Sequence, residues 1–217
     1  YLVLDEDFNT LASLGALKNL DMLVGGDKEF DSNVFYSSVY KAGQYEGSQY
    51  ALPMECNPTL MFVNKTLLQK EGIKVPDNDW TWDDFYDICK TIVKDSDGDG
   101  QMDQFGCYDY TWIQAVYSNG ITPFNQSGTS SNFLDEKFSQ SLEFVKRLEA
   151  TNRNYQVTSN DFDLGKVAFR PFTFSDYRTY MPYPWRIKKY SGFEWTCIRM
   201  PAGPSGDNRS EMSALMA

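Results

Sequence analysis

The chain has 217 residues, of which 41% are hydrophobic, enough for a core in one large domain or two small ones. Its formal net charge of -10 disfavours binding to nucleic acid or to an anionic membrane surface, because like charges repel. The chain has no histidine, which excludes the histidine-dependent serine and cysteine triads.

The N-terminal third of the chain begins with an apolar run, residues 1–4, that is typical of a buried strand. Apolar residues then repeat with helical spacing over residues 8–20 and 30–45, which predicts two helices. The residues expected to face inward in the second of these helices are Phe35, Val39 and Ala42.

Two strands are expected next, over residues 50–53 and 59–63. Pro53 has no backbone N–H to donate, so it is expected to end the first strand. The second strand is apolar throughout, which predicts burial on both faces. Glu55 and Asn57 are expected in the turn between the two strands.

Helix signals dominate the segment that follows. Asn64 begins a helix expected to run to residue 71, with Gly72 just beyond its C-terminal end. Thr81 is expected to cap the next helix, and Asp84 is placed to complete a capping box. Further helices are predicted over residues 112–117 and 135–151, and further strands over residues 167–169 and 194–200. This alternation of strands and helices predicts an α/β fold.

The four cysteines, Cys56, Cys89, Cys107 and Cys197, are widely spaced and form no CxxC pair. This spacing argues against a zinc site. An even number of cysteines permits two disulfides, but most of the four are expected to be small buried apolar residues.

Residues 95–103 read Asp-Ser-Asp-Gly-Asp-Gly-Gln-Met-Asp and form the sharpest local motif. Calcium requires several oxygen ligands in a compact loop, and the spacing follows the first nine positions of an EF-hand loop. Position twelve, where that loop has a bidentate glutamate, is Gly106, and the expected substitute is the side chain of Gln104 or a carboxylate distant in sequence. The predicted ligands are Asp95, Asp97, Asp99, Gln101, Asp103 and Gln104.

The alternative for this loop is a solvated acidic turn without a metal. Four carboxylates packed this closely repel one another in the absence of a cation, which favours calcium as a structural cofactor. A sensor role is not expected, because the C-terminal ligand and a flanking Met-rich groove are both missing.

Five segments occur in the order found in one known family. They are residues 50–68, Val75-Pro76 with residues 81–85 (Thr-Trp-Asp-Asp-Phe), the acidic loop, residues 165–169 (Gly-Lys-Val-Ala-Phe) and residues 200–204 (Met-Pro-Ala-Gly-Pro). In this order they resemble the family-1 extracellular solute-binding proteins, the sugar-type receptors of ABC importers. The resemblance implies a periplasmic-binding-protein-like (class II) fold with two α/β lobes, each a mixed sheet flanked by helices.

The resemblance also implies a division into domains: residues 1–104 as part of the first lobe, 105–209 as part of the second, and 210–217 as the start of the crossover back to the first lobe. The complete protein is expected to be longer at both ends and to carry a lipoprotein-type signal. It is expected to be a monomer located outside the cytoplasm, either as a cell-surface lipoprotein or in the periplasm. Its expected function is to bind a carbohydrate and deliver it to an ABC transporter permease.

The resemblance places ligand contacts in three clusters. A sugar site needs planar polar groups for hydroxyls and aromatic rings for the apolar sugar faces. The expected contacts are Glu55, Asn57, Asp109, Tyr110, Trp112, Tyr177 and Arg178. Each has a structural alternative, namely a turn cap, packing at the hinge or a surface ion pair. Phe174, Trp82 and Trp195 are expected to lie in the core.

Two other functions are open to the same residues. A carbohydrate-active enzyme, such as a fragment of a glycoside hydrolase, could use Glu55 and Asp109 as its carboxylate pair. A dockerin-like calcium module would need two calcium loops in a short helical repeat, and this chain has one. Ligand capture without catalysis is the favoured function.

Overall fold

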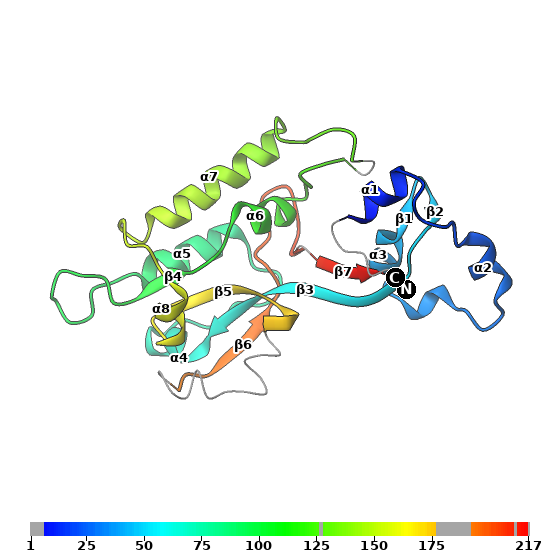
Figure 1. Cartoon of the computed structure of the whole chain (residues 1–217). Coiled ribbons are helices and arrows are strands. Elements are labelled where there is room, and N and C mark those ends of the chain that lie inside the picture. The colour runs from blue at the N-terminus through cyan, green and yellow to red at the C-terminus, as the bar shows by residue number, and fades with distance from the viewer. Residues whose placement is uncertain (1–6, 126–127, 177–191, 211, 217) are drawn as a thin grey trace. The chain divides into compact units, whose positions relative to one another are not determined.

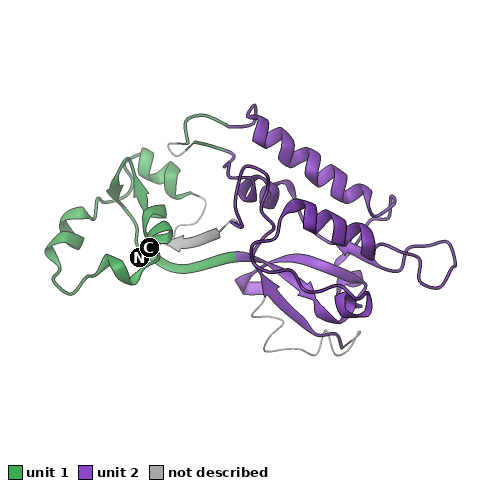
Figure 2. Ribbon diagram, turned by 180° about the vertical axis from the view of Figure 1, so that it is seen from behind, with its two compact units in different colours: residues 1–58, 124–131, 212–217 green, residues 59–123, 132–211 purple. Residues whose placement is uncertain are grey.

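The computed structural model describes residues 7–125, 128–176, 192–210 and 212–216 (Figure 1). The chain divides into two compact units (Figure 2). Unit 1 comprises residues 1–58, 124–131 and 212–217, and unit 2 comprises residues 59–123 and 132–211. The strand predicted over residues 1–4 lies outside the described residues.

Unit 1 contains short elements around a small core. They are α1 (Phe8–Ser13), α2 (Asp21–Gly26), the 3-10 helix η1 (Ser32–Val34), α3 (Ser37–Ala42), β1 (Gln44–Tyr45) and β2 (Ser48–Gln49). Phe8, Ala12 and Ala51 form the buried cluster of this unit. The helix predicted over residues 8–20 is therefore shorter than expected.

The single helix predicted over residues 30–45 is wrong, because η1, α3 and β1 replace it. The side chain of Asp31 accepts a hydrogen bond from the backbone N–H of Asn33 at 2.9 Å, which starts a separate turn. Val39 is buried as predicted and Phe35 is half-buried, whereas Ala42 is exposed.

Strand β3 (Pro53–Asn64) runs from unit 1 into unit 2. Its first half pairs antiparallel with β7 (Met212–Met216), with a bulge between Pro53 and Glu55. The predictions that Pro53 ends a strand and that Glu55 and Asn57 lie in a turn are wrong, because all three belong to this strand. Proline can occupy the first residue of a strand, where no N–H is required.

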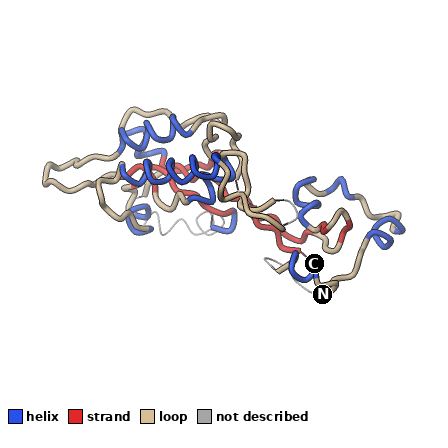
Figure 3. Tube along the Cα trace, turned by 90° about the horizontal axis from the view of Figure 1, so that it is seen from above, coloured by secondary structure: helices blue, strands red, loops and turns tan. Residues whose placement is uncertain are grey.

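Unit 2 is built on a mixed sheet with the strand order β4-β5-β3-β6. Figure 3 draws the strands in red and the helices in blue. The strands are β4 (Phe105–Cys107), β5 (Val167–Thr173), the second half of β3, and β6 (Trp195–Ile198). β4 and β5 are parallel, and β3 is antiparallel to both of its neighbours. Residues 59–63 are buried apart from the half-buried Leu60, which agrees with the predicted strand.

The helices of unit 2 are α4 (Lys65–Lys70), α5 (Trp82–Ile92), α6 (Trp112–Ser118), α7 (Glu136–Ala150) and α8 (Ser159–Asp163). Both hydrogen bonds of the predicted capping box join Thr81 and Asp84 at the start of α5. Gly72 has φ of 70° just beyond α4, as expected for a residue that ends a helix.

Two clusters cover opposite faces of this sheet. Met61 and Val63 of β3 pack with residues of α5 and α7, while Phe62, between them, packs with Phe162 of α8. This alternation is the period of two that a strand imposes on its side chains.

The predicted core positions of the large aromatic residues are partly confirmed. Trp82 is buried, and its ring stacks on Phe144. Trp195 is half-buried and stacks on Phe62 at a centroid distance of 4.4 Å. Phe174 is 41% exposed, so its predicted core position is wrong.

The division expected at residues 104 and 105 concerns the lobes of the complete protein and stays a prediction. In this chain, Gln104 and Phe105 both lie in unit 2. Phe105 begins β4, which is held by its parallel pairing with β5, and Gln104 forms a bridge with Lys94 across the acidic loop.

None of the four cysteines, which all lie among the described residues, forms a disulfide. Cys89 and Cys107 are buried, and Cys56 and Cys197 are half-buried. Burial raises the pKa of the Cys197 thiol to about 11. No helix among the described residues combines the length and apolar character needed to cross a membrane.

Candidate ligand-binding and calcium sites

The junction between β4 and α6 carries three of the sequence-predicted ligand residues. α6 begins with a capping box formed by Thr111 and Gln114. Asp109 lies in the preceding turn, is exposed, and has a left-handed backbone with φ of 64°. Such a conformation is uncommon outside glycine and is tolerated best by Asp and Asn.

Tyr110 and Trp112 differ in their availability to a ligand. The Tyr110 ring is 5% exposed within the core of unit 2, and its hydroxyl lies 3.4 Å from the Ser118 hydroxyl. Burial raises the pKa of Tyr110. Trp112 is 38% exposed, and its ring is tilted against Phe138 at 5.8 Å. Tyr110 is therefore a packing residue, while one part of Trp112 remains accessible.

A cavity of about 570 Å³, here called the β4–α7 cavity, lies wholly within unit 2. Its inner wall is the end of β4 and the turn to α6, which includes Tyr108 and Asp109. Its outer wall is the last turn of α7 and the segment that follows it. The outer-wall residues are Lys146, Leu148, Glu149, Ala150, Asn152, Asn154, Tyr155, Gln156 and Val157.

Tyr155 joins the two walls. Its ring stacks on Phe105 of β4 with centroids 4.4 Å apart, yet the side chain is 44% exposed. The Tyr155 hydroxyl donates to the carboxylate of Asp161 at 3.4 Å, and burial raises the pKa of Tyr155. The ring is thus held in place by Phe105 while part of it stays open to the cavity.

The β4–α7 cavity presents groups suited to a ligand rich in hydroxyls. The carboxylates of Asp109 and Glu149 accept hydrogen bonds, and the amides of Asn152, Asn154 and Gln156 both donate and accept. Tyrosine rings add apolar surface next to these groups. No residue of this outer wall was predicted as a ligand contact. The amide-rich run at residues 152–156, directly after a predicted helix, could have indicated a polar binding surface.

Glu55 and Asn57 lie on β3, opposite Leu215 and Ser213 of β7. Residues two apart on a strand share a face, so these two side chains project on the same side. Glu55 is exposed and Asn57 is half-buried. Tyr177 and Arg178, the remaining predicted ligand residues, lie outside the described residues.

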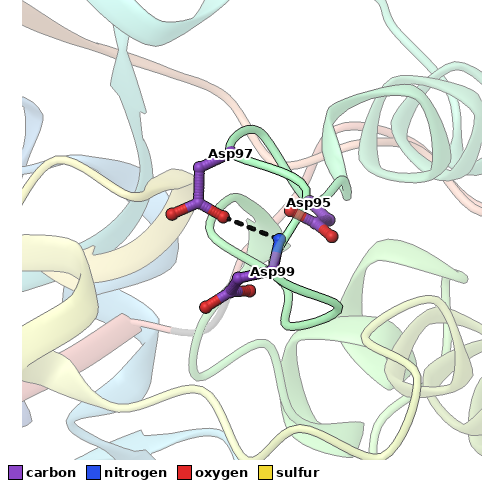
Figure 4. Close-up of side chains that lie close together, drawn as sticks. All are labelled: Asp95, Asp97 and Asp99. Carbon is purple, nitrogen blue, oxygen red and sulfur yellow. Dashed lines mark hydrogen bonds between the residues drawn. The ribbon is translucent and has the colours of Figure 1, made fainter.

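The acidic loop brings together three of its predicted ligands (Figure 4). One carboxylate oxygen from each of Asp95, Asp97 and Asp99 lies within 4.8 Å of the others. Asp95 accepts hydrogen bonds from the backbone N–H groups of Gly98 at 2.6 Å and Gly100 at 2.8 Å, which lower its pKa. Its carboxylate is therefore held ionised and oriented by the loop backbone.

The other three predicted ligands are placed differently. The Asp103 carboxylate accepts from the backbone N–H of Ser96 at 2.9 Å and closes the loop. Gln101 is exposed, and its backbone carbonyl is the group expected to bind calcium, because it occupies position seven of the loop. The Gln104 side chain is buried and bonded elsewhere, because its amide nitrogen donates to Glu71 at 3.1 Å and its amide oxygen accepts from Lys70 at 2.8 Å.

Glu71 completes a network that anchors the end of the acidic loop. It forms an ion pair with Lys94, and the hydrogen bond from Lys94 is the main reason why the pKa of Glu71 is lowered. Gly106, at position twelve, lies against Cys89 of α5, with no room for a side chain. Gln104 thus acts in the structure as an anchor of the loop, and the glutamate position of an EF-hand is taken up by packing.

Comparison with known proteins identifies the family. Residues 3–207 match the family described as bacterial extracellular solute-binding protein. The chain belongs to this family. The description of this family as extracellular and solute-binding agrees with the resemblance seen in the sequence motifs.

Several solved structures share the fold of this chain. An ABC substrate-binding protein from Listeria monocytogenes, in complex with cycloalternan, has a TM-score of 0.71 and 21% identity and covers 99% of this chain. The sugar-binding protein MalE from Xanthomonas citri has a TM-score of 0.72 and 18% identity over 99% of this chain. UspC from Mycobacterium tuberculosis has a TM-score of 0.73 and 18% identity over 98% of this chain.

The solute-binding chain has a periplasmic-binding-protein-like fold, as the sequence motifs implied. It spans 55% of the Listeria and Xanthomonas chains and 57% of UspC.

Proposed function

We propose that this chain is part of an extracellular receptor that captures a carbohydrate and delivers it to the permease of an ABC importer. The observation that carries the proposal is the β4–α7 cavity, where carboxylates, amides and an exposed tyrosine ring line one space. Related structures support the choice of ligand class, since proteins of the same fold bind cycloalternan and mannotriose.

Further features of the receptor belong to this proposal. It is a monomer, and it is either a cell-surface lipoprotein or a periplasmic protein. It binds its ligand without chemical conversion. Of the seven contacts expected from the sequence, six remain in this proposal: Glu55, Asn57, Asp109, Trp112, Tyr177 and Arg178. Tyr110 is not among them, because its ring is buried in the core.

A ligand screen on the complete receptor tests this function. Neutral oligosaccharides, monosaccharides, sugar alcohols and sugar phosphates are added in turn, and the melting temperature is recorded. We expect a carbohydrate to raise the melting temperature, by an amount that grows with the logarithm of its concentration above the dissociation constant. The Asp109→Ala variant should shift less at the same concentration, while a screen in which no carbohydrate raises the melting temperature would refute the proposal.

The enzyme alternative is separated by the same samples. A glycoside hydrolase would need its two carboxylates on either side of a glycosidic bond. Incubation of the receptor with each carbohydrate that it binds, followed by chromatography, should return the carbohydrate intact. Release of shortened sugars that stops in an Asp109→Asn variant would favour the enzyme instead.

We also propose that the acidic loop binds calcium as a structural staple. The three clustered carboxylates of Asp95, Asp97 and Asp99 are the main support, since calcium prefers hard oxygen ligands at short spacing. Asp103 and the backbone carbonyl of Gln101 are the further proposed ligands.

Chelation tests this staple. EDTA should lower the melting temperature of the parent protein, and added calcium should restore it. An Asp97→Asn variant should start from a lower melting temperature and respond less to EDTA. Identical melting curves with EDTA and with calcium would remove calcium from the proposal.

A further inference from the structure

Arg170 of β5 is a half-buried cation with no anionic partner among the described residues. Its guanidinium lies 4.1 Å from the ring centroid of Phe172, 4.9 Å from that of Tyr108 and 5.7 Å from that of Phe162. Its Nε atom is buried and donates no hydrogen bond within the described part of the chain. An arginine side chain is always charged and carries five N–H donors, so aromatic rings alone hold this donor group.

The surrounding sequence offers no counter-ion for this guanidinium. Residues 177–191, which follow β5 along the chain, contain no aspartate or glutamate. Two acidic residues nearby in sequence are engaged elsewhere. Asp161 accepts hydrogen bonds from the backbone N–H and the hydroxyl of Thr158, and Asp176 accepts the same two kinds of bond from Thr173. A half-buried charge without a counter-ion is uncommon, because its desolvation is not compensated by an opposite charge.

Arg147 of α7 shows the usual arrangement of a stacked arginine. Its guanidinium lies 3.8 Å from the ring centroid of Tyr86, and one of its terminal nitrogens lies 3.6 Å from the carboxylate of Asp83. Its side chain is also 51% exposed, so water solvates the charge. Arg147 thus has both a ring and a carboxylate, whereas Arg170 has rings only.

The position of Arg170 is one where a ligand can bind. The pairing of β4 with β5 ends at Cys107 and Phe169, so Arg170 lies one residue beyond it, at the carboxyl end of β4. Ligands of α/β proteins commonly bind outside the carboxyl ends of parallel strands. The Nε atom is closed off, but the two terminal nitrogens are not buried in this way, and they form the edge that an oxyanion can bind through two hydrogen bonds.

We propose that Arg170 binds an oxyanion, either the carboxylate of a sugar acid or the phosphate of a sugar phosphate, and so selects charged over neutral carbohydrates. This inference rests on the proposed function and adds a charge requirement to its ligand. The stacked rings fix the plane of the guanidinium, so little side-chain freedom is lost on binding. The net charge of -10 opposes the approach of anions at long range, so the preference must come from direct contact with this arginine.

The test compares matched ligands in isothermal titrations of the complete receptor. Trigalacturonate is paired with its methyl ester, and glucose 6-phosphate is paired with glucose, so that the charged group distinguishes the members of each pair. We expect the charged member of at least one pair to bind about tenfold more tightly, which corresponds to about 1.4 kcal/mol. The pair that shows this preference identifies the oxyanion as a carboxylate or a phosphate. Equal affinities within both pairs would overturn the inference.

Arg170→Met is the informative variant, because methionine keeps an unbranched apolar side chain among the rings and removes the charge. In this variant the charged and the neutral ligand should bind alike. Arg170→Lys keeps the charge without the planar fork and should retain only part of the preference. Arg147→Met is the matched control and should bind like the parent. A full preference in Arg170→Met would overturn the inference, and if that variant does not fold, a full preference in Arg170→Lys would do so.

The two proposals fail in different ways. If the receptor binds carbohydrates without any preference for charge, the proposed function stands and Arg170 has no role in binding. If no carbohydrate binds, the proposed function is wrong, and citrate, which carries carboxylates but no sugar, tests Arg170 alone. Citrate binding that is lost in Arg170→Met would keep the oxyanion site, whereas absence of citrate binding would remove it as well.

Discussion

The contact between β4 and α5 gives a sharp test of the packing, through the substitution Gly106→Ala. A Cβ atom at Gly106 would lie 2.4 Å from the Cβ and 2.7 Å from the Cα of Cys89. Ordinary carbon contacts are about 3.5–4.0 Å, so the strand and the helix would have to separate by roughly 1 Å. No rotamer change can relieve this clash, because Cα and Cβ belong to the helix frame and Cys89 is fully buried.

The expected cost is large for the addition of one methyl group. Overpacking of a core costs about 1–3 kcal/mol, and a clash with backbone places Gly106→Ala at the upper end. For a chain of this size, about 3 kcal/mol corresponds to a melting temperature lowered by about 6–12 °C. Thermal unfolding followed by circular dichroism measures this shift.

Gly25→Ala is the matched control. Gly25 lies in α2, and an added Cβ would meet no heavy atom within 4 Å. Alanine is favoured over glycine in a helix by about 1 kcal/mol, so this variant should melt at or above the parent temperature. If Gly106→Ala melts like the parent, the close approach of β4 and α5 is wrong, and so is the explanation for the missing glutamate at position twelve.

Three further predictions concern single contacts in unit 2. Tyr110→Phe removes the hydrogen bond to Ser118 and should lower the unfolding free energy by about 0.5–1.5 kcal/mol in urea titrations. Carbohydrate affinity should stay unchanged, because the ring lies in the core. A loss of affinity would return Tyr110 to the ligand site. Thr81→Ala removes the cap of α5 and should cost about 1 kcal/mol in the same assay, whereas an unchanged midpoint would exclude the capping box. The pKa of Glu71 is lowered below its usual 4.5, so its contribution to stability is present above that pH and lost as the pH falls through the folded-state value. The stability difference between the parent and Glu71→Gln should therefore narrow on acidification, and a constant difference from pH 7 to pH 3 would contradict the role of the Lys94 pair.

Local signals in the sequence predicted the elements that depend on local chemistry. The cap of α5 needs Thr81 and Asp84 three residues apart, and both hydrogen bonds form. The burial of Met61, Phe62 and Val63 also follows from composition, because a short apolar strand has no polar face to offer to water.

Elements that depend on distant partners could not be predicted in this way. Glu55 was assigned to a turn because Pro53 has no backbone N–H to donate. Pairing with β7, which lies more than 150 positions further along the chain, keeps this segment extended instead. The helix predicted over residues 30–45 failed for a local reason instead. Asp31 starts a separate turn by accepting a hydrogen bond from the backbone N–H of Asn33, and the rings of Phe30, Phe35 and Tyr40 then pack together.

The candidate sites show the same division. Asp95, Asp97 and Asp99 are close in sequence, and the loop brings their carboxylates together as expected. Gln104 was predicted from loop spacing alone, and its neighbours Glu71 and Lys70, over thirty positions away, determine where its side chain bonds. The β4–α7 cavity joins residues about forty positions apart, so no local pattern could reveal both walls.

Strand β4 links the two candidate sites. Gln104, directly before it, anchors the acidic loop through Glu71, and Phe105, its first residue, supports the ring of Tyr155 in the cavity. Gly106 then fixes the strand against α5. A displacement of β4 in Gly106→Ala is therefore expected to weaken both calcium and carbohydrate binding.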